Sequence, residues 1–427
     1  MRRMSVKRHA LAFGVAAALV LSLGAPALAT NGDNLMAIGP IARSMGGVGV
    51  ANPQDAISAV FSNPAAMCFG NYCPSSQVDF AGTLFMPKVD ASVTNGAGTF
   101  KADSDDTVYA IPAIGLSVPV GVGDGNIRFG LAAYGVTGLG VDYRGTDLDR
   151  PTFYAFPGAA FPMISGEYTQ LQVMKFAPAL ALKASDQLSL GVALHIDYAT
   201  LDLRNGGSAG YGAGGQLGAI FRPTDTVSLG ISYVTPQSVD HDNVADFDGD
   251  NTLDTLELES PQQVAFGCAL APWSDSVLFE VNGKWINWSS AAGYEDFDWE
   301  DQWVIGLGIQ VRPVENLALR AGYNYGDNPV NEHGNFNGMT NVTVQGKTMP
   351  GYYYETFRII GFPAVVKQHV TLGAGYEVTP RFSVELGYTH GFEETLTEQG
   401  TDFTGQPVTL TSSLSEDSLD FGLSWKF

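Results

Sequence analysis

Apolar and polar residues alternate along many segments of this chain. From Leu419 to Phe427 every second residue is apolar and the residues between them are polar or small, and the segments that begin at Val277 and Leu317 alternate in the same way. Successive side chains of a strand point to opposite faces, so a period of two predicts strands with one apolar and one polar face. Aromatic residues gather toward the ends of these segments, as in the girdles of membrane barrels.

Turn sequences rich in Pro or Asp precede the alternating segments and begin at Ala184, Arg222, Ala271, Arg312 and Thr379. These short connections alternate with longer ones, which we expect near 94–106, 139–167, 204–210, 237–255, 289–300, 326–365 and 392–416. A soluble β-sandwich has similar loops at both ends, whereas short turns on one side and long loops on the other are typical of an outer-membrane barrel.

The strands between these connections number fourteen, with both ends of the chain on the short-turn side. An even number fits a closed bacterial barrel, and closure satisfies every backbone group in lipid. We therefore predict an all-β fold, a 14-stranded antiparallel transmembrane β-barrel over residues 76–427. The last residue, Phe427, falls on the apolar face, where a terminal aromatic is read by the barrel-assembly machinery.

The first 29 residues have the three parts of a secretory signal peptide: a basic start, an apolar stretch at 10–23 and the small-residue site Ala27-Leu28-Ala29. A membrane anchor is the alternative, but the apolar stretch is short and is followed by Gly24 and Pro26. No later window holds about 18 unbroken apolar residues, so we expect no membrane helix after cleavage.

The composition of the chain argues against several classes of function. Charged residues make up 15% of the chain, against about a quarter in soluble proteins. The net charge of −22 argues against nucleic acid as a partner. No G-x-S-x-G, phosphate-loop or H-E-x-x-H sequence is present. His195 and His369 fall on inward faces, as do Ser189 and Thr371, but such neighbours are expected by chance in a polar lumen, so we expect no enzyme.

Residues 30–75 do not alternate, and we predict that they form a separate N-terminal hatch. They contain a Gly-rich stretch with Arg43 and Met45, then Asp55-Ala56, then Asn63-Pro64-Ala65. This order resembles the amino-terminal hatch of the long-chain fatty acid transporter family (FadL type). The resemblance implies a bacterial outer-membrane barrel that takes up hydrophobic small molecules by passive diffusion through a plugged lumen with a lateral opening.

A hatch of this kind has a physical reason. A fourteen-strand barrel is wide enough to leak water, because its diameter grows with strand number. Asn63 can cap a short helix and Pro64 can begin it. Ala56, Ile57, Val60 and Phe61 have helical spacing and can pack on the barrel wall. The segment is then a structural plug, and the resemblance implies that Asn63, Pro64 and Ala65 also belong to a gate.

The resemblance also implies an outer ligand groove and a bent third strand. The loop at 151–166 is apolar and almost uncharged; the residues expected to bind ligand are Phe153, Tyr154, Phe156, Phe161 and Met163. The alternative is that this loop packs on itself. The third strand is rich in glycine, and we expect its kink at Gly135–Gly138.

Three functions stay open from the sequence: uptake of long-chain fatty acids, uptake of aromatic or other hydrocarbons, and a structural or adhesive barrel without transport. A carboxylate ligand needs a lumen cation, for which the inward candidates are Arg128, Lys284 and Arg320. The alternative is that these cations pair with lumen acids such as Glu280 and Glu385. The expected partners are the ligand, outer-membrane lipids and the assembly machinery, with the protein as a monomer.

Two further sites are expected, one in the hatch and one in an outer loop. Cys68 and Cys73 should form a disulfide in the oxidising compartment, and Cys268 should face lipid as a free thiol. No cofactor is expected except a structural Ca²⁺ in an acidic outer loop with EF-hand spacing, whose ligands would be Asp246, Asp248, Asp250, Thr252, Asp254 and Glu257. Against it, Asn251 stands where the loop needs Gly, and a solvated acidic loop is the alternative reading.

Overall fold

The structure is a computed structural model that describes residues 31–68, 76–105, 108–121, 126–149, 166–204 and 206–427. The expected signal peptide, residues 1–29, lies outside this part of the chain. Among the described residues, no helix is long and apolar enough to cross a membrane.

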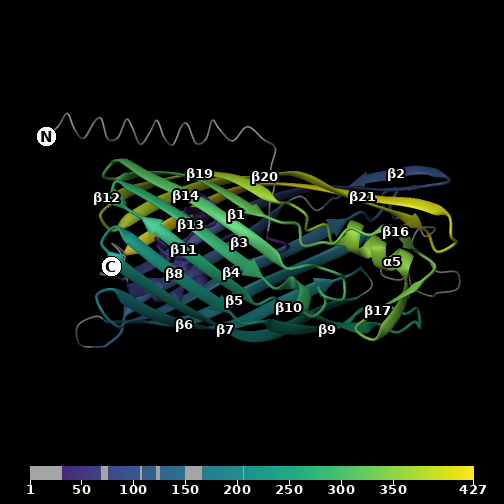
Figure 1. Cartoon of the computed structure of the whole chain (residues 1–427), viewed down its shortest axis with the longest axis horizontal. Coiled ribbons are helices and arrows are strands. Elements are labelled where there is room, and N and C mark those ends of the chain that lie inside the picture. Colours follow the sequence, from purple (N-terminus) through teal and green to yellow (C-terminus); the bar gives the residue numbers. More distant parts are fainter. Residues whose placement is uncertain (1–30, 69–75, 106–107, 122–125, 150–165, 205) are drawn as a thin grey trace.

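Fourteen antiparallel strands form a closed barrel (Figure 1). They are β1 (Gln77–Asn95), β3 (Tyr109–Pro119), β4 (Ile127–Asp142), β5 (Tyr168–Lys183), β6 (Leu188–Asp202), β7 (Gly207–Thr224), β8 (Val227–Val234), β11 (Gln263–Leu270), β13 (Val277–Ile286), β14 (Gln302–Val314), β15 (Leu317–Gly326), β19 (Gln368–Thr379), β20 (Phe382–Thr401) and β21 (Pro407–Lys426). The last strand pairs with the first from Gln77↔Lys426 onward, so closure leaves no free sheet edge in lipid. The predicted fold is confirmed.

The remaining elements lie in the connections and inside the barrel. The connections hold β2 (Gly98–Asp103), β9 (Gln237–Ala245), β10 (Asp254–Ser260), β12 (Pro272–Asp275), η2 (Trp288–Ser290), β16 (Gly334–Asn337), β17 (Asn341–Val344), β18 (Lys347–Pro350), α5 (Gly351–Thr356) and the π-helical turn η3 (Phe357–Gly361). The hatch holds α2 (Pro40–Arg43), α3 (Ala56–Ser62) and the 3₁₀ turn η1 (Pro64–Cys68). Figure 1 shows α5, β16 and β17 at the end of the barrel away from the C-terminus.

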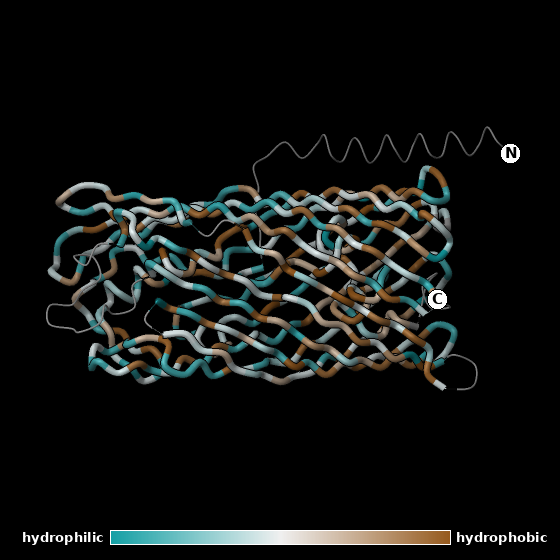
Figure 2. Tube along the Cα trace, turned by 180° about the vertical axis from the view of Figure 1, so that it is seen from behind, coloured by the Kyte–Doolittle hydropathy of each residue, from teal (hydrophilic) through white to brown (hydrophobic). Residues whose placement is uncertain are grey.

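The predicted faces of the strands are observed. Leu419, Phe421 and Trp425 of β21 are each about half exposed on the outer wall, while Asp420 and Ser424 between them are buried. In Figure 2 the hydrophobic residues follow the strands, and hydrophilic colours gather at the loop end. The exposed apolar side chains form the lipid-facing surface of an outer-membrane barrel.

Two expected long loops are strand instead. Residues 203–206 alone join β6 to β7, so no long loop lies at 204–210. The expected loop at 392–416 is a hairpin in which β20 continues to Thr401 and β21 begins at Pro407. Its strands are rich in Thr and Ser, which suit a β-ladder but give no apolar face by which the pattern could be recognised beyond the lipid.

Candidate ligand-binding site

The hatch residues expected from the sequence hold the plug against the barrel wall. Asn63 donates through Nδ2 to the carbonyl oxygens of Val50, Ala219 and Ile231, at 2.9, 3.1 and 3.2 Å. Its Oδ1 accepts from the backbone N–H of Ala65 at 3.1 Å, and Pro64 begins η1. Asn63 therefore caps the turn, as predicted, and also joins the plug to β7 and β8.

Further contacts fix the plug at other points of the barrel wall. Arg43 lies 2.9 Å from the carboxylate of Asp420 and donates to Ser418 Oγ at 2.6 Å, and all three residues are buried. Ser189 donates to the Ala65 carbonyl at 2.7 Å, and Thr371 accepts from the Gly46 N–H at 3.0 Å. The inward hydroxyls that the sequence placed near histidines thus bind plug backbone.

The N-terminal segment of the plug, residues 31–36, crosses the lumen to the third barrel strand. Pairing between β3 and β4 ends at Ala113↔Tyr134, although β4 continues to Asp142. Beyond that point the Leu35 N–H donates to the Val136 carbonyl at 3.0 Å, and the Gly138 N–H donates to the Asp33 carbonyl at 3.4 Å. Plug backbone thus takes the place of β3 along the upper part of β4.

The register of β4 against β5 shifts between Gly135 and Thr137, which places a β-bulge at Val136. This position lies between the two glycines at which the kink was predicted. A bulge bends its strand and breaks the regular ladder. The bend and the loss of β3 pairing occur together, so the barrel wall here is completed by the N-terminal segment.

Aromatic residues of the outer connections hold the same segment from above. The Tyr294 hydroxyl donates to the buried carboxylate of Asp33. Gly32 has φ +67°, and a Cβ atom there would lie 2.6 Å from the Trp288 ring and 3.0 Å from the Trp299 ring. Only glycine fits this position, so the segment is clamped between the aromatic cluster and β4.

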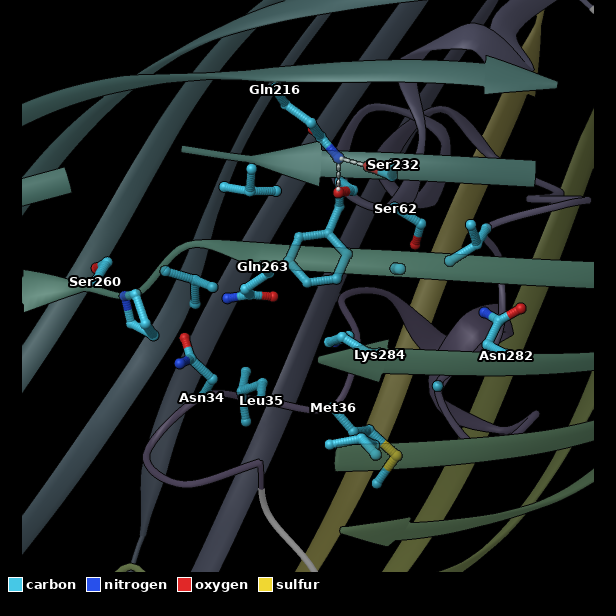
Figure 3. Close-up of a pocket in the computed structure, with 18 of the residues that line it drawn as sticks. Asn34, Leu35, Met36, Ser62, Gln216, Ser232, Ser260, Gln263, Asn282 and Lys284 are labelled. Carbon is cyan, nitrogen blue, oxygen red and sulfur yellow. Dashed lines mark hydrogen bonds between the residues drawn. The ribbon is translucent and has the colours of Figure 1, made fainter. Parts of the chain in front are cut away.

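A cavity lies below this segment (Figure 3). Asn34, Leu35 and Met36 form one side of it, and Gln216 and Ser232 lie on the barrel wall opposite. The cavity has a volume of about 60 Å³, which is room for a few water molecules. A cavity that takes benzene is larger, at roughly 150 Å³. A larger ligand therefore needs the N-terminal segment to move.

The three predicted lumen cations have different surroundings in the structure. Arg320 is buried against Glu385 at 2.6 Å and Gln310 at 2.7 Å, which is the paired alternative. Arg128 donates to Ser117 at 3.1 Å and does not line the cavity. Lys284 lines the cavity and has no ion pair within the described parts of the chain.

Lys175 is a cavity residue that the sequence analysis missed. It lies 3.2 Å from Asp197, directly across the β5–β6 ladder, and donates to Gln237. Both charges occupy inward positions of adjacent strands, which the alternation could have revealed. Because Asp197 neutralises Lys175, the net positive charge of the cavity comes from Lys284.

Some predicted residues fall outside the described parts of the chain. The five loop residues expected to bind ligand, Phe153, Tyr154, Phe156, Phe161 and Met163, lie within 150–165. Cys73 lies within 69–75, so the expected disulfide with Cys68 stays a prediction. Cys268 is exposed and unpaired on the outer wall.

The acidic outer loop is partly assembled. Asp246, Asp248 and Asp254 bring carboxylate oxygens together, and Lys347 Nζ lies 2.6 Å from Asp254 and 3.3 Å from Asp248. The hydrogen bond with Asp254 is the main reason that the pKa of Lys347 is raised.

The rest of the expected calcium loop does not join this cluster. Asp250 accepts from Thr252 instead, and Glu257 lies in β10. Asn251 does adopt the left-handed conformation that the loop requires, with φ +69°. An ammonium group therefore lies beside two of the carboxylates expected to bind calcium.

Comparisons with known proteins agree with this architecture. The family model described as outer membrane protein transport protein (OMPP1/FadL/TodX) matches residues 18–211. The toluene transporter TodX of Pseudomonas putida has a similar structure, with 17% identity, TM-score 0.64, and coverage of 92% of this chain and 99% of that one. A comparison with curated proteins gave no match.

Two further solved structures share the fold. A Pseudomonas aeruginosa FadL homologue is 15% identical, with TM-score 0.66, and covers 94% of this chain and 100% of its own. The toluene transporter TbuX of Ralstonia pickettii is 14% identical, with TM-score 0.60 and coverage of 92% and 99%. The closed lipid-facing barrel with a plug inside it therefore has the fold of these FadL- and TodX-type outer-membrane barrels, and residues 18–211 match the family model.

Proposed function

We propose that this protein takes up amphipathic hydrophobic molecules across the outer membrane, with long-chain fatty acids as the first candidate, and does not change them chemically. Lys284 is the observation that carries the choice of ligand. It lines the lumen cavity beside the apolar residues Leu35, Met36 and Val304, and has no acidic partner among the described residues. A cation beside an apolar surface suits a carboxylate attached to a hydrocarbon chain.

The geometry favours a lateral route, by which the ligand leaves the lumen through the barrel wall into the bilayer. The N-terminal segment lines the cavity beside the upper part of β4, where β3 no longer pairs and the Leu35 N–H donates to the Val136 carbonyl. Withdrawal of residues 31–36 would enlarge the cavity and uncover the wall at Val136 in one movement. A ligand could then pass into the bilayer, which suits a molecule whose chain prefers lipid to water. The plug contacts of Asn63 and Arg43 need not break for this movement.

The test compares binding of oleate with that of oleyl alcohol, which has the same chain and no charge. Lys284→Met should weaken oleate binding about tenfold or more, as expected for loss of a charge-assisted hydrogen bond. It should leave oleyl alcohol unaffected. Lys183→Met, which removes a partly exposed lysine paired with Asp186 at 2.8 Å, is the matched control. Equal oleate affinity in Lys284→Met and the native protein would remove the carboxylate from the proposal.

Uptake of monoaromatic hydrocarbons is the second candidate. Phe61 and Tyr134 line the same cavity, with ring centroids 5.4 Å apart and planes at 87°, an arrangement to which a third aromatic ring can add. Matched structures include toluene transporters and CymD, described as a monoaromatic hydrocarbon channel. Toluene binding that survives Lys284→Met, together with no oleate binding by the native protein, would favour this candidate.

A further inference from the structure

The connection from β15 to β19, residues 327–367, turns back into the mouth of the barrel. Every residue from 351 to 366, which covers α5 and η3, is buried. Phe357 and Phe362 of this stretch pack against one another with ring centroids 5.7 Å apart, and Phe362 lies 6.4 Å from Tyr294. Since Tyr294 holds Asp33 of the N-terminal segment, the stretch forms a roof over that segment.

A charged cluster outside the ligand cavity fixes this roof. His333 Nδ1 lies 2.8 Å from Glu355 of α5, and its Nε2 lies 2.7 Å from Asp298 in the connection between β13 and β14. The backbone N–H of His333 donates to Glu398 of β20 at 2.7 Å. The imidazole thus joins the roof to the connection between β13 and β14, and the backbone of the same residue is bound to β20.

Arg358 of η3 is the other cation of the cluster. Its Nη1 lies 2.6 Å from Glu355, 3.1 Å from Glu398 and 3.1 Å from His333 Nδ1. Arg358 is 1% exposed, so its charge depends on these partners. Three carboxylates, those of Asp298, Glu355 and Glu398, therefore face two cationic side chains. Of the two cations only His333 titrates near neutral pH, and among the carboxyls burial raises the pKa of Glu398 to about 7.

The two carboxylates beside His333 favour the imidazolium, and the Arg358 guanidinium beside Nδ1 opposes it. Both ring nitrogens lie within hydrogen-bond distance of a carboxylate, and only the charged ring can donate from both at once. The hydrogen bond with Glu355 is the largest cause of a raised pKa of His333, against the opposing effects of burial and Arg358. A raised pKa stabilises the folded cluster fully below the unfolded value of about 6.5, and this stabilisation is lost as pH rises through the folded value.

We propose that His333 is a pH-sensitive latch: when it is charged it holds the α5–η3 roof over the N-terminal segment, and when it is neutral it releases the roof. Loss of the proton leaves three carboxylates facing the Arg358 guanidinium alone. Repulsion between them then separates Asp298 and Glu398 from α5. The consequence for ligand entry rests on the proposed transport function, whereas movement of the roof does not.

Hydrogen–deuterium exchange of the full-length barrel in detergent tests the latch directly. Exchange of residues 351–366, corrected for the intrinsic effect of pH, should rise about tenfold between pH 6 and about pH 9. His333→Gln should exchange fast at both pH values. His390→Gln, which breaks an outer pair with Asp417 at 2.8 Å, should behave as the native protein. The same corrected rate at both pH values in the native protein would overturn the latch.

A second variant guards against misfolding of His333→Gln. Asp298 has φ +57°, which asparagine tolerates, so Asp298→Asn keeps the backbone while removing one carboxylate from His333. Its exchange transition should move to lower pH, and an unmoved transition would contradict the latch. Oleate uptake is measured on the same samples. A pH-dependent roof with no uptake at any pH would support the latch and count against the transport function alone.

Discussion

Asn63 of the plug lies directly against Gly218 of strand β7, where a Cβ atom would overlap the carboxamide oxygen. Other inward glycines face plug backbone in the same way: Gly191 against Ala65, and Gly230 against Val50. The barrel wall therefore has glycine at the positions where the plug comes closest to it. The plug is thus seated by close contact with the wall as well as by hydrogen bonds.

Gly218→Val should therefore push Asn63 out of its seat. We expect an assembled barrel with a loosened plug, measured as higher single-channel conductance in planar bilayers. Gly283→Val is the matched control, because a Cβ atom on Gly283 meets nothing within 4 Å. Conductance that rises equally in both variants would mean that valine disturbs the strands and not the plug.

Asn63→Ala should leave the barrel assembled and reduce fatty acid uptake. The change removes the cap of η1, which is worth about 1 kcal/mol, and removes a donor to three carbonyl oxygens. Heat-modifiable migration on gels reports assembly, and oleate uptake by cells reports function. Normal uptake through a normally assembled barrel would show that Asn63 only fills space.

Tyr294→Phe should release the N-terminal segment. The Asp33 carboxylate would lose its side-chain donor while staying buried, at a cost of about 1–3 kcal/mol. Faster hydrogen exchange at residues 31–36 is the expected result. Tyr325→Phe removes a comparable hydroxyl that donates to exposed Asp327 at 2.7 Å and should change nothing there. If hydrogen exchange at residues 31–36 is unchanged in Tyr294→Phe, the hydrogen bond between Tyr294 and Asp33 does not hold the N-terminal segment.

Thiol counting under denaturing conditions without reductant should give one free thiol per chain. Cys268 is unpaired, and we expect Cys68 and Cys73 to be joined. A lipid-soluble maleimide should label Cys268 in native membranes, because this side chain is exposed on the outer wall. A count of three would disprove the disulfide.

Calcium binding to the acidic loop should compete with Lys347. Because its ammonium already lies against Asp248 and Asp254, Lys347→Gln should bind Ca²⁺ more tightly than the native protein. The native site should be weak, at about 10⁻⁴–10⁻³ M as in extracellular modules. Calorimetry with an Asp248→Asn, Asp250→Asn double variant is the control. Equal heats from all three proteins would leave only a solvated loop.

The barrel was predictable because its signal is local. A strand that faces lipid on one side must alternate, as Leu419, Phe421 and Trp425 do, and a count of turns then gives the strand number. The hairpin beyond Phe392 was not predictable in this way, because outside the lipid neither face of its strands has to be apolar.

The site was less accessible to sequence reasoning. The alternation of inward and outward positions placed Arg128, Lys284 and Arg320 on the inner wall. Only the three-dimensional arrangement shows that Glu385 neutralises Arg320 and that Lys284 faces the cavity. The pairing of Leu35 with Val136 joins segments about a hundred residues apart. No periodicity in either segment reveals such a contact.

The backbone contacts between the N-terminal segment and β4 have a practical consequence for anyone who labels this protein. Anything fused ahead of Asn31 is attached to the piece of chain that completes the wall beside Val136 and Gly138. An affinity tag or a fluorescent reporter at that end would hold the N-terminal segment either away from the barrel wall or against it. Probes are better attached at the turn between β7 and β8, where Thr224, Asp225 and Thr226 are exposed.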